Sequence, residues 1–69
     1  MNITDSKHIW CKIRYYQHLY GISNEQLAKT INIKPRTLSS YDKSSQNLTL
    51  GQIDSFLSEY SLTMEELLS

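Results

Sequence analysis

The sequence predicts an all-α domain, and three observations carry that prediction. Apolar residues recur three and four positions apart, as on one face of an amphipathic helix. The helix-capping pattern Ser/Thr-x-x-Gln/Glu occurs three times, at 23–26, 49–52 and 63–66. No stretch alternates long enough to predict a strand, and Gly and Pro are scarce, with two Gly and one Pro. We therefore expect five short helices packed as a compact globule.

The first helix is expected over residues 5–20. Its apolar stripe is made by residues at helical spacing and is widened by two neighbours: Ile9, Ile13, Tyr16 and Tyr20, with Trp10 and Leu19. Gly21 follows, and it supplies the left-handed residue that commonly ends a helix.

The second helix should begin after Ser23, whose hydroxyl can accept from a free backbone N–H while Gln26 reaches back, and should end at about Thr30. The third should begin near Pro35, whose missing N–H is tolerated at a first helical position, and end near Lys43. Four apolar residues of this region should share one core: Leu27, Ile31, Leu38 and Tyr41.

The last two capping patterns open the remaining helices. Thr49 should start a fourth helix that runs to about Tyr60, with this buried face: Leu50, Ile53, Leu57 and Tyr60, with Phe56 beside them. Thr63 should start a short terminal helix that carries Leu67 and Leu68.

Length and composition narrow the class of protein. A chain of 69 residues makes one domain, expected over 1–69. Because its core is modest, we expect the domain either to pack very regularly or to dimerise. One Cys excludes an intrachain disulfide and favours a reducing compartment. We see no signal peptide and no run long enough to span a bilayer, so we expect a soluble cytoplasmic protein without membrane contact.

Charge is distributed unevenly although the formal net charge is zero. Residues 1–43 hold all seven basic residues and three acids, a balance of +4, whereas residues 44–69 hold four acids and no Lys or Arg. This asymmetry suggests that one face of the protein binds an anionic partner and that another face binds a different partner.

The stretch from 23 to 42 is the most specific feature. It predicts a short helix, a tight break and a second helix whose polar side chains stay outside: Asn24, Arg36, Thr37, Ser39 and Ser40. In the arrangement that enters the DNA major groove, a short helix supports a second helix, and the polar N-terminal end of that second helix is exposed.

The chain from Ile13 to Leu68 resembles the Cro/C1-type (XRE-like) helix-turn-helix domain of phage repressors and related bacterial regulators. The resemblance rests on these matches: Leu27-Ala28, Ile33, Leu38, Asp42 and the terminal run from Leu62 to Leu68. The chain departs from the family pattern at four positions: Asn32 and Ser44 where Gly is usual, Leu48 where Pro is usual, and Gln17 where Arg is usual. The resemblance implies a lambda-repressor-like five-helix fold with the helix-turn-helix at about 23–43.

The resemblance also implies the DNA-reading residues, at the start of the third helix: Pro35, Arg36, Thr37 and Ser40, with Ser39 nearby. Arg36 is the strongest candidate because its planar fork can donate two hydrogen bonds to guanine O6 and N7. Pro35 makes no polar contact and is assigned to helix initiation. Phosphate contacts are expected from these residues: Asn24, Lys34, Lys43, Arg14 and Gln17.

Two functions are compatible with these features. The first is a sequence-specific transcriptional regulator, a small repressor of phage or mobile-element type that binds double-stranded DNA as a homodimer. The second is a module of the same fold that binds protein, such as a phage-encoded inhibitor or an antitoxin-like binder, with weak or no DNA binding. The neutral net charge and the acidic second half favour the second reading.

Catalysis and metal binding find little support in the sequence. Cys11, His8 and His18 are the residues that would suggest such a site, but no convincing further ligand or oriented base accompanies them. We therefore expect no enzyme, no metal, no cofactor and no evident small-molecule ligand.

Overall fold

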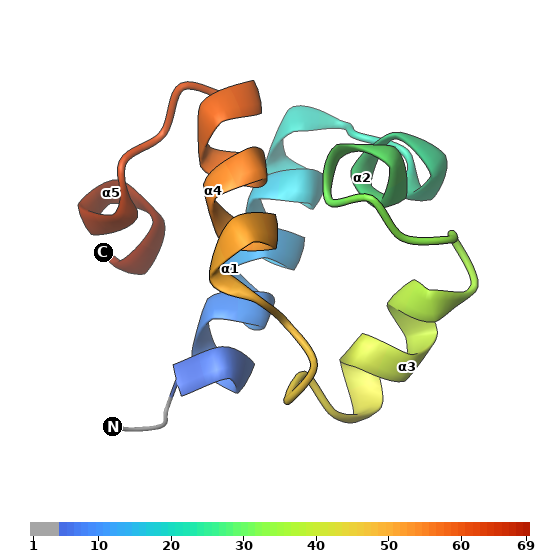
Figure 1. Ribbon diagram of the computed structural model, residues 1–69. Helices are drawn as coiled ribbons and strands as arrows, with labels where there is room; N and C mark the ends of the chain where they lie inside the picture. The colour runs from blue at the N-terminus through green and yellow to red at the C-terminus, as the bar shows by residue number, and fades with distance from the viewer. Residues whose placement is uncertain (1–4) are drawn as a thin grey trace.

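The computed structural model of this chain describes residues 5–69, so residues 1–4 of the expected domain lie outside the described part. It contains five helices in the order α1 (Asp5–Tyr20), α2 (Asn24–Thr30), α3 (Thr37–Lys43), α4 (Leu50–Glu59) and α5 (Met64–Leu68), and no strand within those residues (Figure 1). The all-α prediction is therefore confirmed. The third helix begins two residues after Pro35, because the chain first makes a tight turn in which Leu38 N donates to Pro35 O at 3.1 Å.

Three helices begin at the predicted capping boxes. The hydroxyls of Ser23, Thr49 and Thr63 accept from the backbone N–H three residues later, at 3.0–3.1 Å. The side chain at that later position accepts in return from the cap N–H, at 2.9–3.2 Å. The residue before each cap is apolar and packs against the core: Ile22, Leu48 and Leu62. Hydrogen bonding and packing thus set the same three helix starts.

Three helices end in a left-handed residue, namely Gly21 (φ 68°), Asn32 (φ 62°) and Ser61 (φ 55°). After each of them, the next backbone N–H returns to a carbonyl five residues back at 2.9 Å: Ile22 to Gln17, Ile33 to Ala28 and Leu62 to Leu57. This is the Schellman arrangement, which satisfies carbonyls that a helix end leaves free. The sharp turns let short helices change direction within a few residues.

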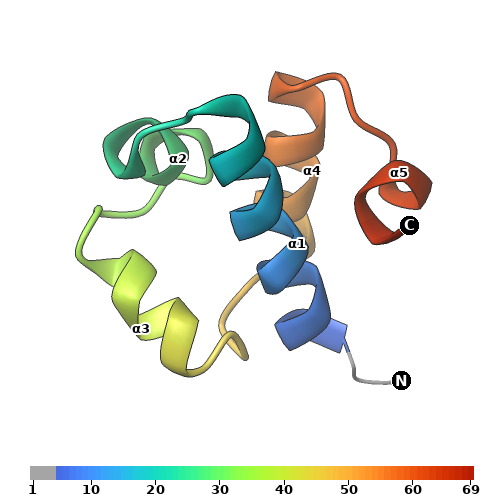
Figure 2. The ribbon, with the colours of Figure 1, turned by 180° about the vertical axis from the view of Figure 1, so that it is seen from behind.

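The core is built from buried side chains of all five helices, and α1 and α4 overlap through the middle of the molecule in both views (Figures 1 and 2). α5 packs against α1, and α2 packs against both α4 and α3. Six side chains are almost completely buried: Ile13, Leu27, Ile31, Leu38, Phe56 and Leu67. Tyr41 is also buried, so the four residues expected to share a core across α2, the turn and α3 do so.

Three apolar residues expected in buried stripes are exposed instead. Leu50 is 75 % exposed because it is the first residue of α4, and side chains at a helix start lean toward the N-terminus, here beyond the edge of the core. Leu19 is 59 % exposed because it lies on the side of α1 opposite Trp10. Tyr20 closes α1 and is 47 % exposed, with its ring against Tyr16 and Tyr60.

Among the residues that the structure describes, no helix has the length and apolar character needed to cross a membrane.

Candidate nucleic-acid interface

α3 presents a polar side to solvent. Leu38 and Tyr41 are buried and hold the helix against the core, whereas Ser39, Ser40 and Lys43 are exposed. Arg36 precedes the helix in a helical backbone conformation and is exposed as well, while Thr37 is half-buried. Because positions 36, 40 and 43 are four and three residues apart, they lie along one side of the helix. That side carries one hydroxyl and two cations, while the exposed Asp42 lies beside Ser39 and pairs with Arg14.

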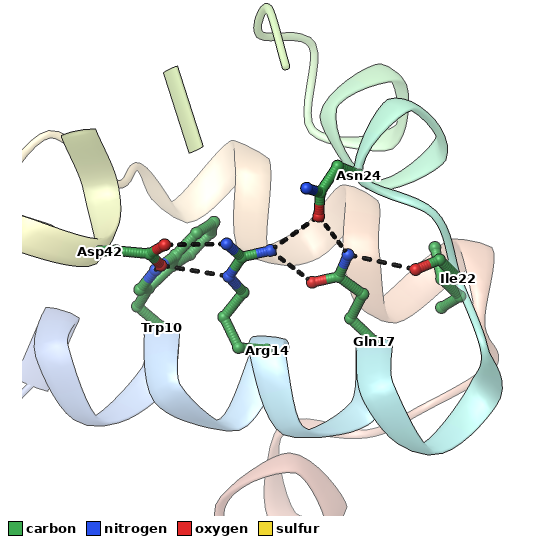
Figure 3. A network of polar contacts seen from close by, with 6 residues as sticks. All are labelled: Trp10, Arg14, Gln17, Ile22, Asn24 and Asp42. Carbon is green, nitrogen blue, oxygen red and sulfur yellow. Dashed lines mark hydrogen bonds and ion pairs between the residues drawn. The ribbon is translucent and has the colours of Figure 1, made fainter. Parts of the chain in front are cut away.

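A carboxylate near the end of α3 fixes this helix to α1 (Figure 3). Asp42 Oδ1 accepts from the buried Trp10 indole Nε1 at 2.8 Å and from Arg14 Nε at 3.1 Å. Asp42 Oδ2 accepts from Arg14 Nη2 at 2.8 Å. The Trp10 ring also meets Tyr41 edge-on, with centroids 5.2 Å apart. A bidentate guanidinium and an indole N–H therefore define where α3 ends relative to α1.

The same Arg14 reaches the start of α2. Its Nη1 donates to Gln17 Oε1 at 2.6 Å and to Asn24 Oδ1 at 3.1 Å. Gln17 Nε2 in turn donates to Asn24 Oδ1 at 2.8 Å and to the backbone oxygen of Ile22 at 3.1 Å. One continuous set of hydrogen bonds, visible in Figure 3, thus links α1 to the first residue of α2 and to the end of α3. We call these residues the bracing network: Trp10, Arg14, Gln17, Ile22, Asn24 and Asp42.

The bracing network sets the charge state of its carboxylate. The hydrogen bonds from Arg14 hold the pKa of Asp42 below its usual value, with further lowering by the Trp10 N–H and the guanidinium charge. Partial burial acts in the opposite direction and is outweighed. Asp42 is therefore ionised at neutral pH, when it pairs with Arg14.

The structure separates the expected phosphate contacts into two groups. Lys34 and Lys43 are exposed, and neither forms an ion pair within residues 5–69. Gln17 is only 8 % exposed, and both polar atoms of its amide are engaged inside the protein. All three guanidinium nitrogens of Arg14 are likewise engaged. We therefore assign Gln17 and Arg14 a bracing role between α1, α2 and α3.

Asn24 joins the bracing network to the surface. Its Oδ1 accepts from both Arg14 and Gln17, which leaves Nδ2 as the polar group of this exposed side chain with no partner among residues 5–69. An amide N–H₂ is a donor only. Asn24 therefore has donors left for an outside acceptor, and its expected contact with phosphate stays a prediction.

The bracing network was not anticipated, although the sequence contained a sign of it. Trp10, Arg14 and Gln17 are four and three residues apart, so all three lie along one side of the first helix. That side borders buried Ile13, and polar atoms placed there need partners. What the spacing did not reveal is which residues of the later helices supply those partners.

Among residues 5–69, no group of three His, Cys, Asp or Glu side chains is placed to hold a metal ion.

Comparison with known proteins finds no protein-family model, no curated protein and no solved structure that matches this chain.

Proposed function

We propose that this chain is a sequence-specific DNA-binding regulator in which α2 and α3 act as a helix-turn-helix. In this proposal α3 enters the major groove and α2 lies across the backbone. The supporting observation is the exposed row of Arg36, Ser40 and Lys43 along α3, a helix that Leu38 and Tyr41 anchor to the core. The resemblance to Cro/C1-type domains points to a small repressor of phage or mobile-element type.

The side chains divide into base-reading and phosphate-binding roles. Arg36 has no acidic partner within residues 5–69, so its guanidinium is available to guanine O6 and N7. The hydroxyls of Thr37, Ser39 and Ser40 can donate to or accept from neighbouring base edges. Asn24 at the start of α2, Lys34 before α3 and Lys43 at the end of α3 would contact phosphates, which makes binding salt-dependent.

A homodimer suits this mode of binding. One domain presents one short reading helix, and two copies related by a two-fold axis would read a near-palindromic operator with half-sites about 34 Å apart. In vitro selection of bound duplexes from a random pool tests this directly. A palindromic consensus with that spacing is expected, and a pool that shows no enrichment would contradict sequence-specific binding.

Arg36→Ala tests the principal contact. Loss of a bidentate contact to guanine should weaken binding to the selected operator by about 1–3 kcal/mol and relax preference at one base pair. Lys29→Ala is the matched control, since it removes one exposed cation from α2, away from the reading side of α3. Equal affinity of Arg36→Ala and wild type for the operator, measured by fluorescence anisotropy, would remove Arg36 from the reading set.

A second candidate function is a protein-interaction module. Tyr15 and Leu19 are 55 % and 59 % exposed on the side of α1 that faces away from Trp10. Exposed aromatic and aliphatic side chains are typical of surfaces that bind protein. A gel-shift titration with random duplex at low salt separates the two candidates, because no binding at micromolar protein would favour the interaction module.

A further inference from the structure

A surface hollow of about 270 Å³ lies between the first turns of α1 and the segment that follows α3. Lys7 and Trp10 line it from α1, Lys43 lines it from the end of α3, and Ser45 lines it from the loop toward α4. None of the proposed base-reading residues lines it, namely Arg36, Thr37, Ser39 and Ser40, and it shares only Lys43 with the exposed side of α3.

Ser45 is the unusual residue of this hollow. It is only 6 % exposed, and among residues 5–69 no donor or acceptor pairs with its hydroxyl. Its backbone oxygen accepts from Leu48 N at 3.0 Å, so the loop itself is held in place. Buried hydroxyls in proteins are normally hydrogen-bonded, so the Ser45 hydroxyl, which has no partner among residues 5–69, has hydrogen-bonding capacity left for an outside group.

The charges around the hollow favour an anion. Lys7 and Lys43 both line it, and neither forms an ion pair within residues 5–69. Asp42 lines it too, but both of its carboxylate oxygens already accept from Trp10 and Arg14. The side chains left without a partner among residues 5–69 include the ammonium groups of Lys7 and Lys43 and the buried hydroxyl of Ser45, with further polar groups from Ser6, Ser44 and Gln46; the negative charge of Asp42 is balanced by Arg14.

We propose that this hollow binds a phosphate group. A tetrahedral oxyanion accepts several hydrogen bonds at once, which matches a hollow lined by a buried serine and two lysines. The volume admits inorganic phosphate or a small phosphate monoester, whose organic part would rest against Trp10 and Tyr41. Since the hollow lies beside the end of α3, a phosphodiester of bound DNA is the other source of the same group.

Amide chemical shifts of ¹⁵N-labelled protein, titrated with inorganic phosphate and with chloride at equal ionic strength, test the site. Saturable shifts are expected with phosphate and not with chloride, and they should centre on residues 6–11 and 43–46. Ser45→Ala should weaken phosphate binding about tenfold, the usual effect of losing a hydrogen bond to a charged group. Lys43→Gln should weaken it roughly threefold, as for one exposed charge.

Lys29→Gln is the matched control, because it removes an exposed lysine from α2 without touching the hollow. Lys43 is exposed, so Lys43→Gln should leave the fold intact. It therefore still tests phosphate binding if Ser45→Ala lowers thermal stability. The proposal is overturned if neither inorganic phosphate nor duplex DNA gives saturable shifts at Ser45. It is also overturned if the Lys29 and Lys43 variants lose affinity equally.

Competition with a random duplex identifies the source of the phosphate. Displacement of inorganic phosphate from the hollow by duplex assigns the site to the DNA backbone, whereas simultaneous binding assigns it to a free phosphate or monoester. The phosphate titration needs no DNA, so the hollow and the DNA-binding function can fail separately.

Discussion

The bracing network makes a quantitative prediction for Asp42. Asp42→Ala removes the acceptor of the Trp10 indole N–H and the ion-pair partner of Arg14 in one step. Asp42→Asn keeps a side-chain oxygen for Trp10 but removes the charge. The two variants therefore separate the hydrogen bond to Trp10 from the ion pair with Arg14.

Burial decides the size of each contribution. Trp10 is 3 % exposed, so leaving its N–H without a partner should cost about 1–2 kcal/mol. The side chains of Arg14 and Asp42 are 29 % and 43 % exposed, which places their ion pair in the surface range of at most about 1 kcal/mol. We expect Asp42→Ala to lower the free energy of unfolding by about 2 kcal/mol and Asp42→Asn by about 1 kcal/mol or less.

Urea denaturation and thermal melts followed by circular dichroism measure these differences. For a domain of this size, the alanine variant should melt roughly 10 °C below wild type. Asp54→Ala is the control, since Asp54 is an exposed acid on α4 without an ion pair in residues 5–69 and should change stability by less than about 0.5 kcal/mol. A loss below that limit for Asp42→Ala, or equal losses for both Asp42 variants, would refute the role given to the Trp10 hydrogen bond.

Two further predictions concern pH and backbone strain. The pKa of folded Asp42 is lowered, so its contribution to stability is present above the pKa of an unfolded Asp, about 4, and is lost as pH falls through the lower folded value. The difference in unfolding free energy between wild type and Asp42→Asn should therefore shrink below about pH 4, and a difference that stays constant from pH 7 to pH 3 would contradict this. Ser61→Gly should raise the unfolding free energy by about 0.5 kcal/mol, because relief of the left-handed backbone at Ser61 slightly exceeds the added freedom of the unfolded chain. Ser58→Gly, inside α4, should instead lower it by about 0.5–1 kcal/mol, and the same sign for both variants would reject the strain argument.

The bracing network also connects stability with the proposed interface. Arg14 contacts Asp42 at the end of α3 and Asn24 at the start of α2, so one α1 side chain contacts both helices proposed to meet DNA. A variant of Arg14 should therefore affect DNA binding through the placement of α2 and α3, although the three guanidinium nitrogens of Arg14 are already engaged within the protein. Any reduced binding by such a variant must be compared with its stability before a direct phosphate contact is assigned.

Much of the fold could be predicted because its signals are local. A hydroxyl and an amide or carboxylate three residues apart suffice to start α2, α4 and α5, and Gly21 and Asn32 suffice to end α1 and α2. Periodicity identified most of the core for the same reason, since a helix places residues three and four apart on one side. It overestimated burial at Leu19, Tyr20 and Leu50, where residues stand at a helix end or on the side of α1 opposite Trp10.

The candidate site was predictable only in part. The exposure of Arg36, Ser39 and Ser40 followed from the pattern of α3, because their neighbours Leu38 and Tyr41 had to be buried. The roles of Arg14 and Gln17 did not follow, since a polar residue on a helix surface looks the same in sequence whether it faces phosphate or another helix. The buried hydroxyl of Ser45, without a partner in the described part of the chain, was equally hidden, because its burial depends on the loop after α3 folding back beside α1.

The sequence by itself therefore determined the helices, their ends and the side of each that is apolar, since those properties depend on hydrogen bonds and spacings within a few residues. Only the tertiary structure decided which polar groups meet. Asp42 lies 32 residues from Trp10 and 28 from Arg14, and their pairing exists only once α1 and α3 are packed together. Side-chain hydrogen bonds reach about 3 Å, so their partners are chosen by the packing of helices and not by order along the chain.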